Sequence, residues 1–348
     1  MNIKKYKKAK LILEDNSEFE GYSFGYEGST NGEVVFNTGM VGYEESLTDP
    51  SYHGQILVLT YPLIGNYGVS NNFESESIKV KGLIVSSYID EYSHSDAQKS
   101  LAQWLIQEKV PAIFGIDTRA LTKKLRERGV MLGKIVFDNK DLDLIDYNQE
   151  NLVAKVSIKK SKIYGQGKKK IILVDCGYKK SILDNFIKRD IKVKVVPWNY
   201  DYTKEKYDGL FISNGPGDPA KCDKTIYYLK KALSQNKPIF GICLGSQIMG
   251  LSAGAKTYKL KYGHRSQNQP CLESGTKKCY LTSQNHGYAI KEKSLPKDWE
   301  IMFTNINDET IEGIKHRTKP FFSVQFHPEV HPGPDDTSFL FDEFIKLL

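Results

Sequence analysis

From residue 171 onward, short apolar runs alternate with segments in which apolar residues recur at helical spacing. This alternation is typical of a parallel sheet, because a chain that connects parallel strands has to cross back over the sheet, usually as a helix. We therefore predict an α/β domain with a mostly parallel sheet that helices flank on both faces. The predicted strands span 171–174, 192–196, 209–212 and 239–242, and the predicted helices span 180–189 and 225–233.

The first 150 residues have a different pattern. Short runs of alternating apolar residues, such as 10–13, 34–36 and 55–60, are separated by clusters of Gly, Asn and Pro, which predicts a β-rich domain. Helical patterns are seen at 97–108, before a proline, and at 119–128, which ends before a glycine. This part of the chain is therefore expected to be mostly β with a few helices.

A length of 348 residues suggests about two domains if a domain takes roughly 150 residues. Between the two patterns the chain is polar and rich in lysine, which indicates a linker. We predict a β-rich N-terminal domain at 1–155, a linker at 156–169 and the α/β domain at 170–348. A last predicted helix, 337–348, carries an apolar stripe that should belong to the core.

The charge balance and the apolar runs exclude some classes of partner. The net charge is +7, but 42 acidic residues are spread among 49 basic ones, which favours a solvated mixed surface over a nucleic-acid site. The chain shows no apolar stretch near the roughly 20 residues that cross a bilayer. The lysines near the N-terminus are not followed by an apolar segment, so we expect neither a membrane span nor a secretion signal.

The cysteines and histidines do not predict a disulfide framework or a metal site. The five cysteines are an odd number without a CxxC pair. The histidines at 264, 286, 316 and 331 do not stand at metal-ligand spacing from cysteines or carboxylates. We therefore predict that the chain binds no metal and lies in a reducing, cytoplasmic compartment.

Residues 241–245 read Gly-Ile-Cys-Leu-Gly and stand between the predicted strand 239–242 and a helix-compatible segment. Glycines on both sides of Cys243 permit the sharp strand-to-helix turn that exposes a nucleophile, as in the G-x-S-x-G elbow. The positive end of the helix dipole would stabilise a thiolate there. By itself the motif is equally compatible with a buried structural cysteine beside two turn glycines.

A base for such a nucleophile is offered near the end of the chain. The predicted strand 321–326 runs directly into His327-Pro328-Glu329. Proline restricts the preceding residue to extended conformations, so His327 and Glu329 should point to the same side, within hydrogen-bonding reach of each other. A surface turn is the better reading of this tripeptide alone, but together with the elbow the pair supplies a base and its orienting carboxylate.

Residues 213–219 read Ser-Asn-Gly-Pro-Gly-Asp-Pro and follow the predicted strand 209–212. In a doubly wound sheet, loops at the carboxyl ends of strands bind ligand, and a glycine-rich loop can turn its N–H groups toward an oxyanion. The N–H of Leu244 is the natural second donor. An ordinary turn is the alternative. The chain lacks a G-x-x-x-x-G-K-[ST] sequence, so a phosphate loop for ATP is not predicted.

These three motifs resemble, in order and in type, those of the class I glutamine amidotransferases. The resemblance implies that Cys243 attacks the side-chain amide of L-glutamine, that His327 is the general base and acid, and that Glu329 orients the imidazole. It further implies that ammonia leaves and that a γ-glutamyl thioester is then hydrolysed.

The resemblance extends over nearly the whole chain to the small, glutamine-hydrolysing subunits of carbamoyl phosphate synthetases. Segments of the N-terminal half carry it, and other class I glutaminases lack them. They are 36–43, 47–52, 59–66, 115–122 and 129–133. The resemblance implies a glutamine site formed by residues of both domains, namely Ser51, Gly215, Gly217, Leu244, Gln247, Asn285, Gly287 and Tyr288.

The chain departs from the family pattern at a few positions, which affects local packing. Ser246 stands where histidine is usual, Ser266 and Gln269 interrupt the usual GHRGxNHP sequence, and Tyr288 replaces phenylalanine. The three residues of the expected triad are unaffected.

The resemblance also implies a partner, because ammonia is useful only where bicarbonate is activated. We expect a tight complex with a large synthetase subunit, docked through the N-terminal domain, in which ammonia crosses a tunnel. The large subunit would hold ATP and Mg²⁺ and consume two ATP per carbamoyl phosphate, while this chain needs no cofactor. Heterodimers that assemble further are possible, and the isolated chain should hydrolyse glutamine slowly.

Two other functions remain open at this point. The first is a γ-glutamyl hydrolase or cysteine peptidase that acts alone on the same elbow, against which the N-terminal segments count. The second is a non-catalytic binding subunit of a synthetase that uses free ammonia, against which the presence of Cys243, His327 and Glu329 together counts.

Overall fold

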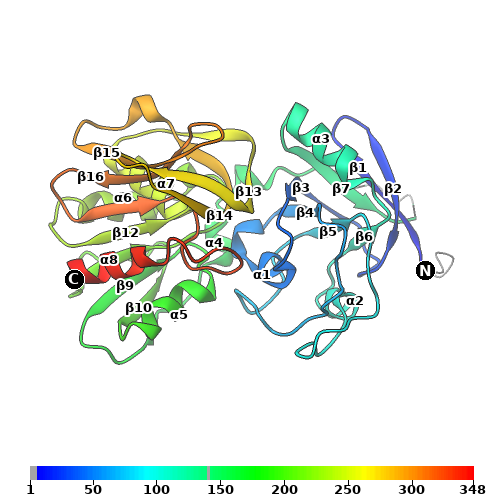
Figure 1. Cartoon of the computed structure of the whole chain (residues 1–348), viewed down its shortest axis with the longest axis horizontal. Helices are drawn as coiled ribbons and strands as arrows, with labels where there is room; N and C mark the ends of the chain where they lie inside the picture. The colour runs from blue at the N-terminus through cyan, green and yellow to red at the C-terminus, as the bar shows by residue number, and fades with distance from the viewer. Residues whose placement is uncertain (1–5, 139–141) are drawn as a thin grey trace. The chain divides into compact units, whose positions relative to one another are not determined.

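The computed structural model describes residues 6–138 and 142–348. The chain divides into two compact units, Met1–Gln149 and Glu150–Leu348, drawn in Figure 1 in blue to green and in green to red. Each unit has its own core of buried apolar side chains, as expected of separate domains.

The first unit is built on a closed β-barrel, which confirms the predicted β-rich domain. Among the described residues, its seven strands have the order β1-β2-β6-β5-β4-β3-β7. The three neighbouring pairs from β3 to β6 are parallel and the other pairs are antiparallel. The elements are β1 (Lys8–Leu13), β2 (Glu18–Ser23), β3 (Thr30–Asn37), α1 (Tyr43–Thr48), η2 (Pro50–Tyr52), β4 (Gln55–Leu59), β5 (Gly82–Val85), α2 (Leu101–Gln107), β6 (Ala112–Phe114), α3 (Thr118–Arg128), β7 (Met131–Val136) and η3 (Tyr147–Gln149).

The two predicted helices of this unit begin and end at capping residues. Helix α2 begins later than the apolar pattern suggested, because Ser100 and Gln103 form a capping box at its start. The side chain of Asp117 accepts a hydrogen bond from the N–H of Ala120 at 2.8 Å and caps α3. Helix α3 ends at Gly129, whose φ of 105° suits glycine.

The second unit is an α/β domain built on a ten-stranded sheet, counted over the described residues. The strand order is β14-β13-β15-β16-β17-β12-β11-β9-β10-β8. The elements are α4 (Val153–Val156), β8 (Lys162–Tyr164), β9 (Lys170–Asp175), α5 (Lys180–Lys188), β10 (Lys192–Pro197), β11 (Gly209–Ile212), η4 (Pro219–Lys221), α6 (Asp223–Ala232), β12 (Ile239–Ile242), α7 (Leu244–Ala253), β13 (Thr257–Glu273), β14 (Cys279–Ile290), η5 (Glu292–Ser294), β15 (Trp299–Asn305), β16 (Ile311–His316), β17 (Phe321–Val324) and α8 (Phe339–Leu347).

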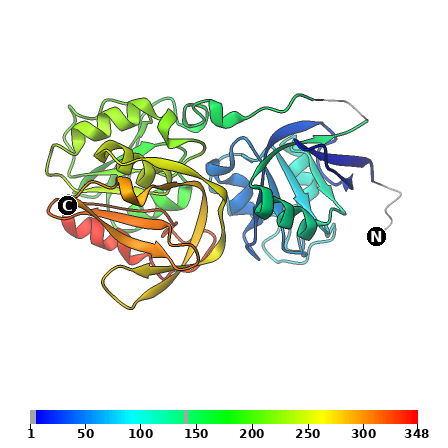
Figure 2. The ribbon, with the colours of Figure 1, turned by 90° about the horizontal axis from the view of Figure 1, so that it is seen from above.

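The centre of this sheet is parallel and buried on both faces, as the alternation of strands and helices predicted. Strands β10, β9, β11, β12 and β17 are parallel neighbours. Along β9, Ile171 and Leu173 pack into one core cluster while Ile172 and Val174 pack into the other, because side chains alternate between the faces of a strand. Figures 1 and 2 show α8 (red) and α6 (yellow-green) on opposite faces.

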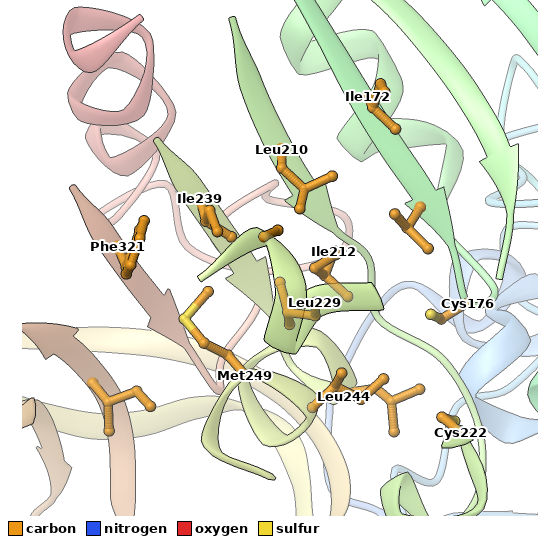
Figure 3. Packing of buried hydrophobic residues seen from close by; sticks show 14 of the residues in the cluster. Ile172, Cys176, Leu210, Ile212, Cys222, Leu229, Ile239, Leu244, Met249 and Phe321 are labelled. Carbon is orange, nitrogen blue, oxygen red and sulfur yellow. The ribbon is translucent and has the colours of Figure 1, made fainter. Parts of the chain in front are cut away.

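Figure 3 shows how strands and helices share one of these clusters. Side chains from β9, β11, β12 and β17 meet Leu229 of α6 and Leu244 and Met249 of α7. On the other face, the predicted stripe of α8 is confirmed as core: Phe341 and Phe344 are fully buried. At roughly 1.5–3 kcal/mol for each large apolar side chain buried, this packing fixes both helix layers against the sheet.

The structure differs from the sequence prediction at two places. The expected linker 156–169 belongs to the second unit, since β8 pairs with β10. The end of the expected first domain, 150–155, also belongs to that unit, where Val153 of α4 lies in the core. The pattern was misleading because β8 is a three-residue strand in a lysine-rich segment. The antiparallel strands β13 to β16 extend the sheet beyond its predicted parallel part.

Two further features bear on the predictions from composition. In the described part of the chain, the helices are all too short or too polar to cross a bilayer. All five cysteines are free thiols.

Candidate active site

Two parallel strands bring distant parts of the sequence to one edge of the sheet. Strand β12 pairs with β17, with Ile242 opposite Val324, and the N–H of Cys243 donates to the carbonyl of Val324 at 2.8 Å. Parallel strands end at the same edge, so Cys243 and the residues that follow β17 emerge side by side.

Cys243 occupies a strained turn between β12 and α7. Its φ of 55° and ψ of −107° are rare for a residue with a side chain. The turn needs its glycines: a Cβ on Gly241 would lie 2.8 Å from the carbonyl oxygen of Gly245, and a Cβ on Gly245 would overlap the carbonyl oxygen of Ile212. Backbone strain of this kind persists only where the surrounding structure holds the residue in place. In a strand-to-helix elbow, this conformation turns the side chain of the central residue away from the strand.

His327 and Glu329 form the expected pair. Nδ1 of His327 lies 2.6 Å from Oε1 of Glu329, and both side chains are buried. Since Nδ1 faces a carboxylate, it carries the proton, and Nε2 is left for other chemistry. Among the described residues, Nε2 has no hydrogen-bond partner.

The thiol of Cys243 is close enough to this imidazole to influence its pKa. Burial, the largest influence, lowers the pKa of His327, but the Glu329 carboxylate and the Cys243 thiol outweigh it and raise the pKa to about 10. The thiol itself is buried and donates to the carbonyl oxygen of Asn285 at 3.7 Å. Cys243, His327 and Glu329 therefore lie together, with Asn285 at the sulfur.

Lys179 is a fourth charged member that the sequence prediction missed. Its Nζ lies 2.9 Å from Oε1 of Glu329 and also donates to the carbonyl of His331. Burial would raise the pKa of Glu329, but the Lys179 ammonium, followed by His327, lowers it to about 2. Lys179 directly precedes α5 and follows soon after β9. Its position after a predicted parallel strand, at the carboxyl edge of the sheet, was the one feature of the sequence that could have indicated a site residue.

The predicted loop after β11 lies beside the elbow. A Cβ on Gly215 would overlap the carbonyl oxygen of Cys176 and lie 2.9 Å from a methyl carbon of Leu244, so the loop is close to the start of α7. Gly217 has a φ of 82°, which glycine adopts readily. Leu244 is the first residue of α7, where backbone N–H groups lack an intrahelical acceptor.

The segment of β14 that faces the elbow is fixed by Gln247. The side-chain amide of Gln247 donates to the carbonyl oxygen of Tyr288 at 2.8 Å and to Oε1 of Gln325 at 3.0 Å. The backbone of Tyr288 makes this contact, which explains how tyrosine can replace phenylalanine there. Gly287 lies between His286 and Tyr288, and a Cβ on it would lie 3.3 Å from the Arg265 guanidinium. Gln325 was not predicted.

Ser51 lies in the first unit, in η2. Its N–H donates to the carboxylate of Asp49 at 2.9 Å, and the residue is buried. Its expected contact with glutamine stays a prediction.

The departures from the family pattern are paired with one another or with a neighbour. The hydroxyls of Ser246 and Ser323 lie 2.9 Å apart and are buried. The amide of Gln269 donates to the hydroxyl of Ser266 at 2.8 Å, and its oxygen accepts from Asn305 at 3.3 Å. These side chains satisfy one another locally, and the elbow geometry is kept.

An elbow cysteine, a histidine and a carboxylate at one edge of a parallel sheet are the arrangement expected of a class I glutamine amidotransferase. A family model of that class matches the second unit. The chain belongs to the class-I glutamine amidotransferase family, whose model matches residues 172–347. Its other unit matches, over residues 11–135, the carbamoyl-phosphate synthase small chain, CPSase domain. The predicted family is thus confirmed.

The chain is similar to parts of much longer proteins. It is 50% identical over 354 residues to carbamoyl-phosphate synthase [ammonia], mitochondrial, of Homo sapiens, with 98% of this chain and 24% of that protein covered. It is 52% identical over 354 residues to the multifunctional protein CAD of Squalus acanthias, with 97% and 16% covered. The chain therefore spans a quarter or less of the length of these relatives.

Proposed function

We propose that this chain hydrolyses L-glutamine to glutamate and ammonia. Cys243 is the nucleophile, His327 the general base and acid, and Glu329 the group that orients the imidazole. The observation that supports this most directly is geometric: paired parallel strands bring the elbow cysteine to the same sheet edge as an imidazole whose Nδ1 is held by a buried carboxylate.

The reaction follows from the positions of these groups. The sulfur of Cys243 attacks the carboxamide carbon of glutamine while its proton is held on Nε2 of His327. The N–H of Leu244 and the glycine loop at 215–217 face the developing oxyanion. Collapse of the intermediate breaks the C–N bond, His327 gives its proton to the departing nitrogen, and ammonia leaves a γ-glutamyl thioester. His327 then takes a proton from a water molecule, which attacks the thioester. The C–S bond breaks, glutamate leaves, and His327 returns the proton to the sulfur of Cys243.

The glutamine backbone needs fixed polar partners, because its α-amino and α-carboxylate groups are charged. Asn285 of β14 contacts the thiol, and Gln247 anchors the same strand through the carbonyl of Tyr288, next to Gly287. Backbone groups held in this way bind without loss of rotamer entropy. We assign the glutamine site to Ser51, Gly215, Gly217, Leu244, Gln247, Asn285, Gly287 and Tyr288.

The ammonia serves carbamoyl phosphate synthesis in this proposal. The carbamoyl-phosphate synthase small-chain domain supports this, as do relatives that are several times longer and carry that name. A large synthetase subunit would bind ATP and Mg²⁺ and combine ammonia with bicarbonate at the expense of two ATP. The first unit docks on that subunit, and the complex is cytoplasmic.

A second function is favoured by one observation. The name of the human relative specifies ammonia, so a chain of this family could serve a synthetase that takes free ammonia. The free thiol of Cys243, near a His327–Glu329 pair, favours hydrolysis instead, because these residues together supply a nucleophile, a base and its orienting carboxylate.

The experiment that separates the two functions uses the chain in complex with its large subunit. Carbamoyl phosphate formation is measured with glutamine and with ammonium as nitrogen donor, for the unaltered chain and for Cys243→Ser. We expect the variant to lose the glutamine-dependent reaction and keep the ammonium-dependent one. Equal glutamine-dependent rates would show that the chain only binds.

A further inference from the structure

A second group of polar side chains is buried beside the candidate active site, on the antiparallel part of the sheet. His264 of β13, His286 of β14 and Glu312 of β16 hold possible ligand atoms within 4.8 Å of one another, and Gln284 of β14 contacts both imidazoles. We call these four residues the His–Glu cluster. The sequence did not predict it, since His264 and His286 become neighbours only through the pairing of β13 with β14.

Four atoms of the cluster converge. Oε1 of Gln284 lies 2.9 Å from Nδ1 of His264 and 3.1 Å from Nε2 of His286. Oε1 of Glu312 lies 3.3 Å from Nδ1 of His264 and 3.7 Å from Nε2 of His286. In a tetrahedral site with metal–ligand bonds of about 2.0–2.2 Å, ligand atoms stand about 3.3–3.6 Å apart.

The outer contacts of the two imidazoles make the inner nitrogens acceptors. Nε2 of His264 lies 2.8 Å from a carboxylate oxygen of Asp308, and Nδ1 of His286 lies 2.9 Å from the carbonyl oxygen of Tyr288. In the neutral form of each ring the proton lies on this outer nitrogen, and the inner nitrogen presents a lone pair. A carboxylate or carbonyl behind each ligating histidine is the usual arrangement around a protein-bound metal.

The amide of Gln284 is oriented in the same sense. Its nitrogen donates to the sulfur of Cys271 at 3.4 Å and to the hydroxyl of Thr282 at 3.1 Å, so its oxygen faces the cluster. The donors nearest the inner atoms are Thr310, 3.2 Å from Oε1 of Glu312, and Asn305, at the long distance of 3.5 Å from Nδ1 of His264.

Glu312 is the residue that most needs a counter-charge. Its side chain is fully buried, and Oε2 has no hydrogen-bond partner among the described residues. Burying a carboxylate without full pairing costs several kcal/mol. A second proton on His264 would give a hydrogen-bond donor to one of the two oxygens, and Nε2 of His286 would still face the oxygens of Gln284 and Glu312. A cation would instead contact both nitrogens and both oxygens.

We propose that the His–Glu cluster binds one divalent metal ion, with zinc the best match. Two imidazole nitrogens and two oxygens at these separations suit its tetrahedral coordination. Asp308, whose side chain is 40% exposed, stands at the outer side and offers an entry path from solvent. The ion would hold β13, β14 and β16 together behind the segment that borders Cys243, as a structural site.

The test measures metal in the full chain and does not depend on glutamine hydrolysis. The unaltered chain and the variants Glu312→Gln and His264→Asn are loaded with zinc sulfate, dialysed against metal-free buffer and analysed by mass spectrometry for zinc. His316→Gln is the matched control, because His316 is also on β16 and pairs with Asp298 at 3.2 Å outside the cluster.

We expect about one zinc per chain in the unaltered protein and in the control, and loss of most of it in both cluster variants. Equal zinc contents in all four proteins, or none in the unaltered chain, would overturn the proposal. Because loss of zinc in a variant that fails to fold would not test the site, cobalt is also added to the unaltered chain. The intense visible absorption of tetrahedral cobalt is expected, and the weak absorption of octahedral cobalt would overturn the site as assigned.

Discussion

The ammonium of Lys179 and the carboxylate of Glu329 form an ion pair at 2.9 Å, with 4% and 0% of their side chains exposed. The same carboxylate oxygen also binds Nδ1 of His327. One oxygen therefore serves two cations, and Lys179 keeps Glu329 ionised while Glu329 holds the imidazole. Lys179 is a positioning residue in this arrangement.

Replacing Lys179 by Met should destabilise the protein and change its pH dependence. The buried Glu329 would lose a counter-charge, for which about 3–5 kcal/mol of unfolding free energy is a typical loss. Because Lys179 is the first of the groups that lower the pKa of Glu329, the acid limb of kcat/KM for glutamine hydrolysis should move to higher pH. Lys179→Arg should restore part of both effects.

The control for this substitution is its neighbour. Lys180 pairs with Asp184 on the surface, and its side chain is 63% exposed. Lys180→Met should change the unfolding free energy by no more than about 0.5 kcal/mol and leave the pH profile in place. If Lys179→Met behaved like Lys180→Met, the positioning role would be wrong.

Replacing Gly245 by Ala should distort the elbow. The new methyl would overlap the carbonyl oxygen of Ile212, and overpacking of this kind costs about 1–3 kcal/mol. The rate of glutamine hydrolysis should fall by about 100-fold while the protein stays folded, because a displacement of the Cys243 sulfur by about 1 Å can have that effect on the rate.

Gly275 supplies the comparison for that variant. It has a φ of 76°, but open space surrounds its Cβ position. Gly275→Ala should therefore lose about 1–2 kcal/mol from backbone strain alone, and the hydrolysis rate should be unchanged. Equal losses of activity in the two variants would contradict the account of the elbow.

The protonation of His327 should make stability fall in mild alkali. Its pKa is about 10 in the folded chain against an ordinary 6.5. A raised pKa means that the proton stabilises the folded state, fully so below pH 6.5, and that this contribution is lost as the pH rises toward 10. Each pH unit in that window is worth up to about 1.4 kcal/mol.

Urea unfolding at pH 7 and pH 9 tests this. The free energy of unfolding should fall more in the unaltered chain than in His327→Gln, because the variant lacks the titrating ring. Identical slopes in both proteins would show that His327 does not carry the proton.

Much of the fold could be predicted from apolar periodicity. The central strands and helices of the second unit lie within a few residues of their predicted positions, because both faces of a parallel sheet are covered and the pattern is strong. Strand β8 was missed because it is short and lies at the sheet edge among lysines. The pairing of β13 with β14 could not be predicted, since antiparallel register depends on contacts far apart in sequence.

Some residues of the candidate site could be predicted from the sequence and others could not. Cys243, His327 and Glu329 follow strand ends and carry recognisable local motifs, so their meeting was predictable. Lys179 and Gln325 lack a motif, and only the folded sheet places them beside Glu329 and Gln247. The His–Glu cluster was missed because its residues come from three strands.

The most direct test of the central claim is to capture the covalent intermediate. The full chain is mixed with glutamine, quenched in acid within one turnover, digested and examined by mass spectrometry, with Cys243→Ser and Cys279→Ser in parallel. Cys279 is exposed, so its variant should behave like the unaltered chain. We expect a γ-glutamyl group on the peptide that contains Cys243 and a fall in glutamate release of at least about 10⁴-fold in Cys243→Ser. Glutamate release by Cys243→Ser at the unaltered rate, with no adduct on Cys243 in the unaltered chain, would contradict the account.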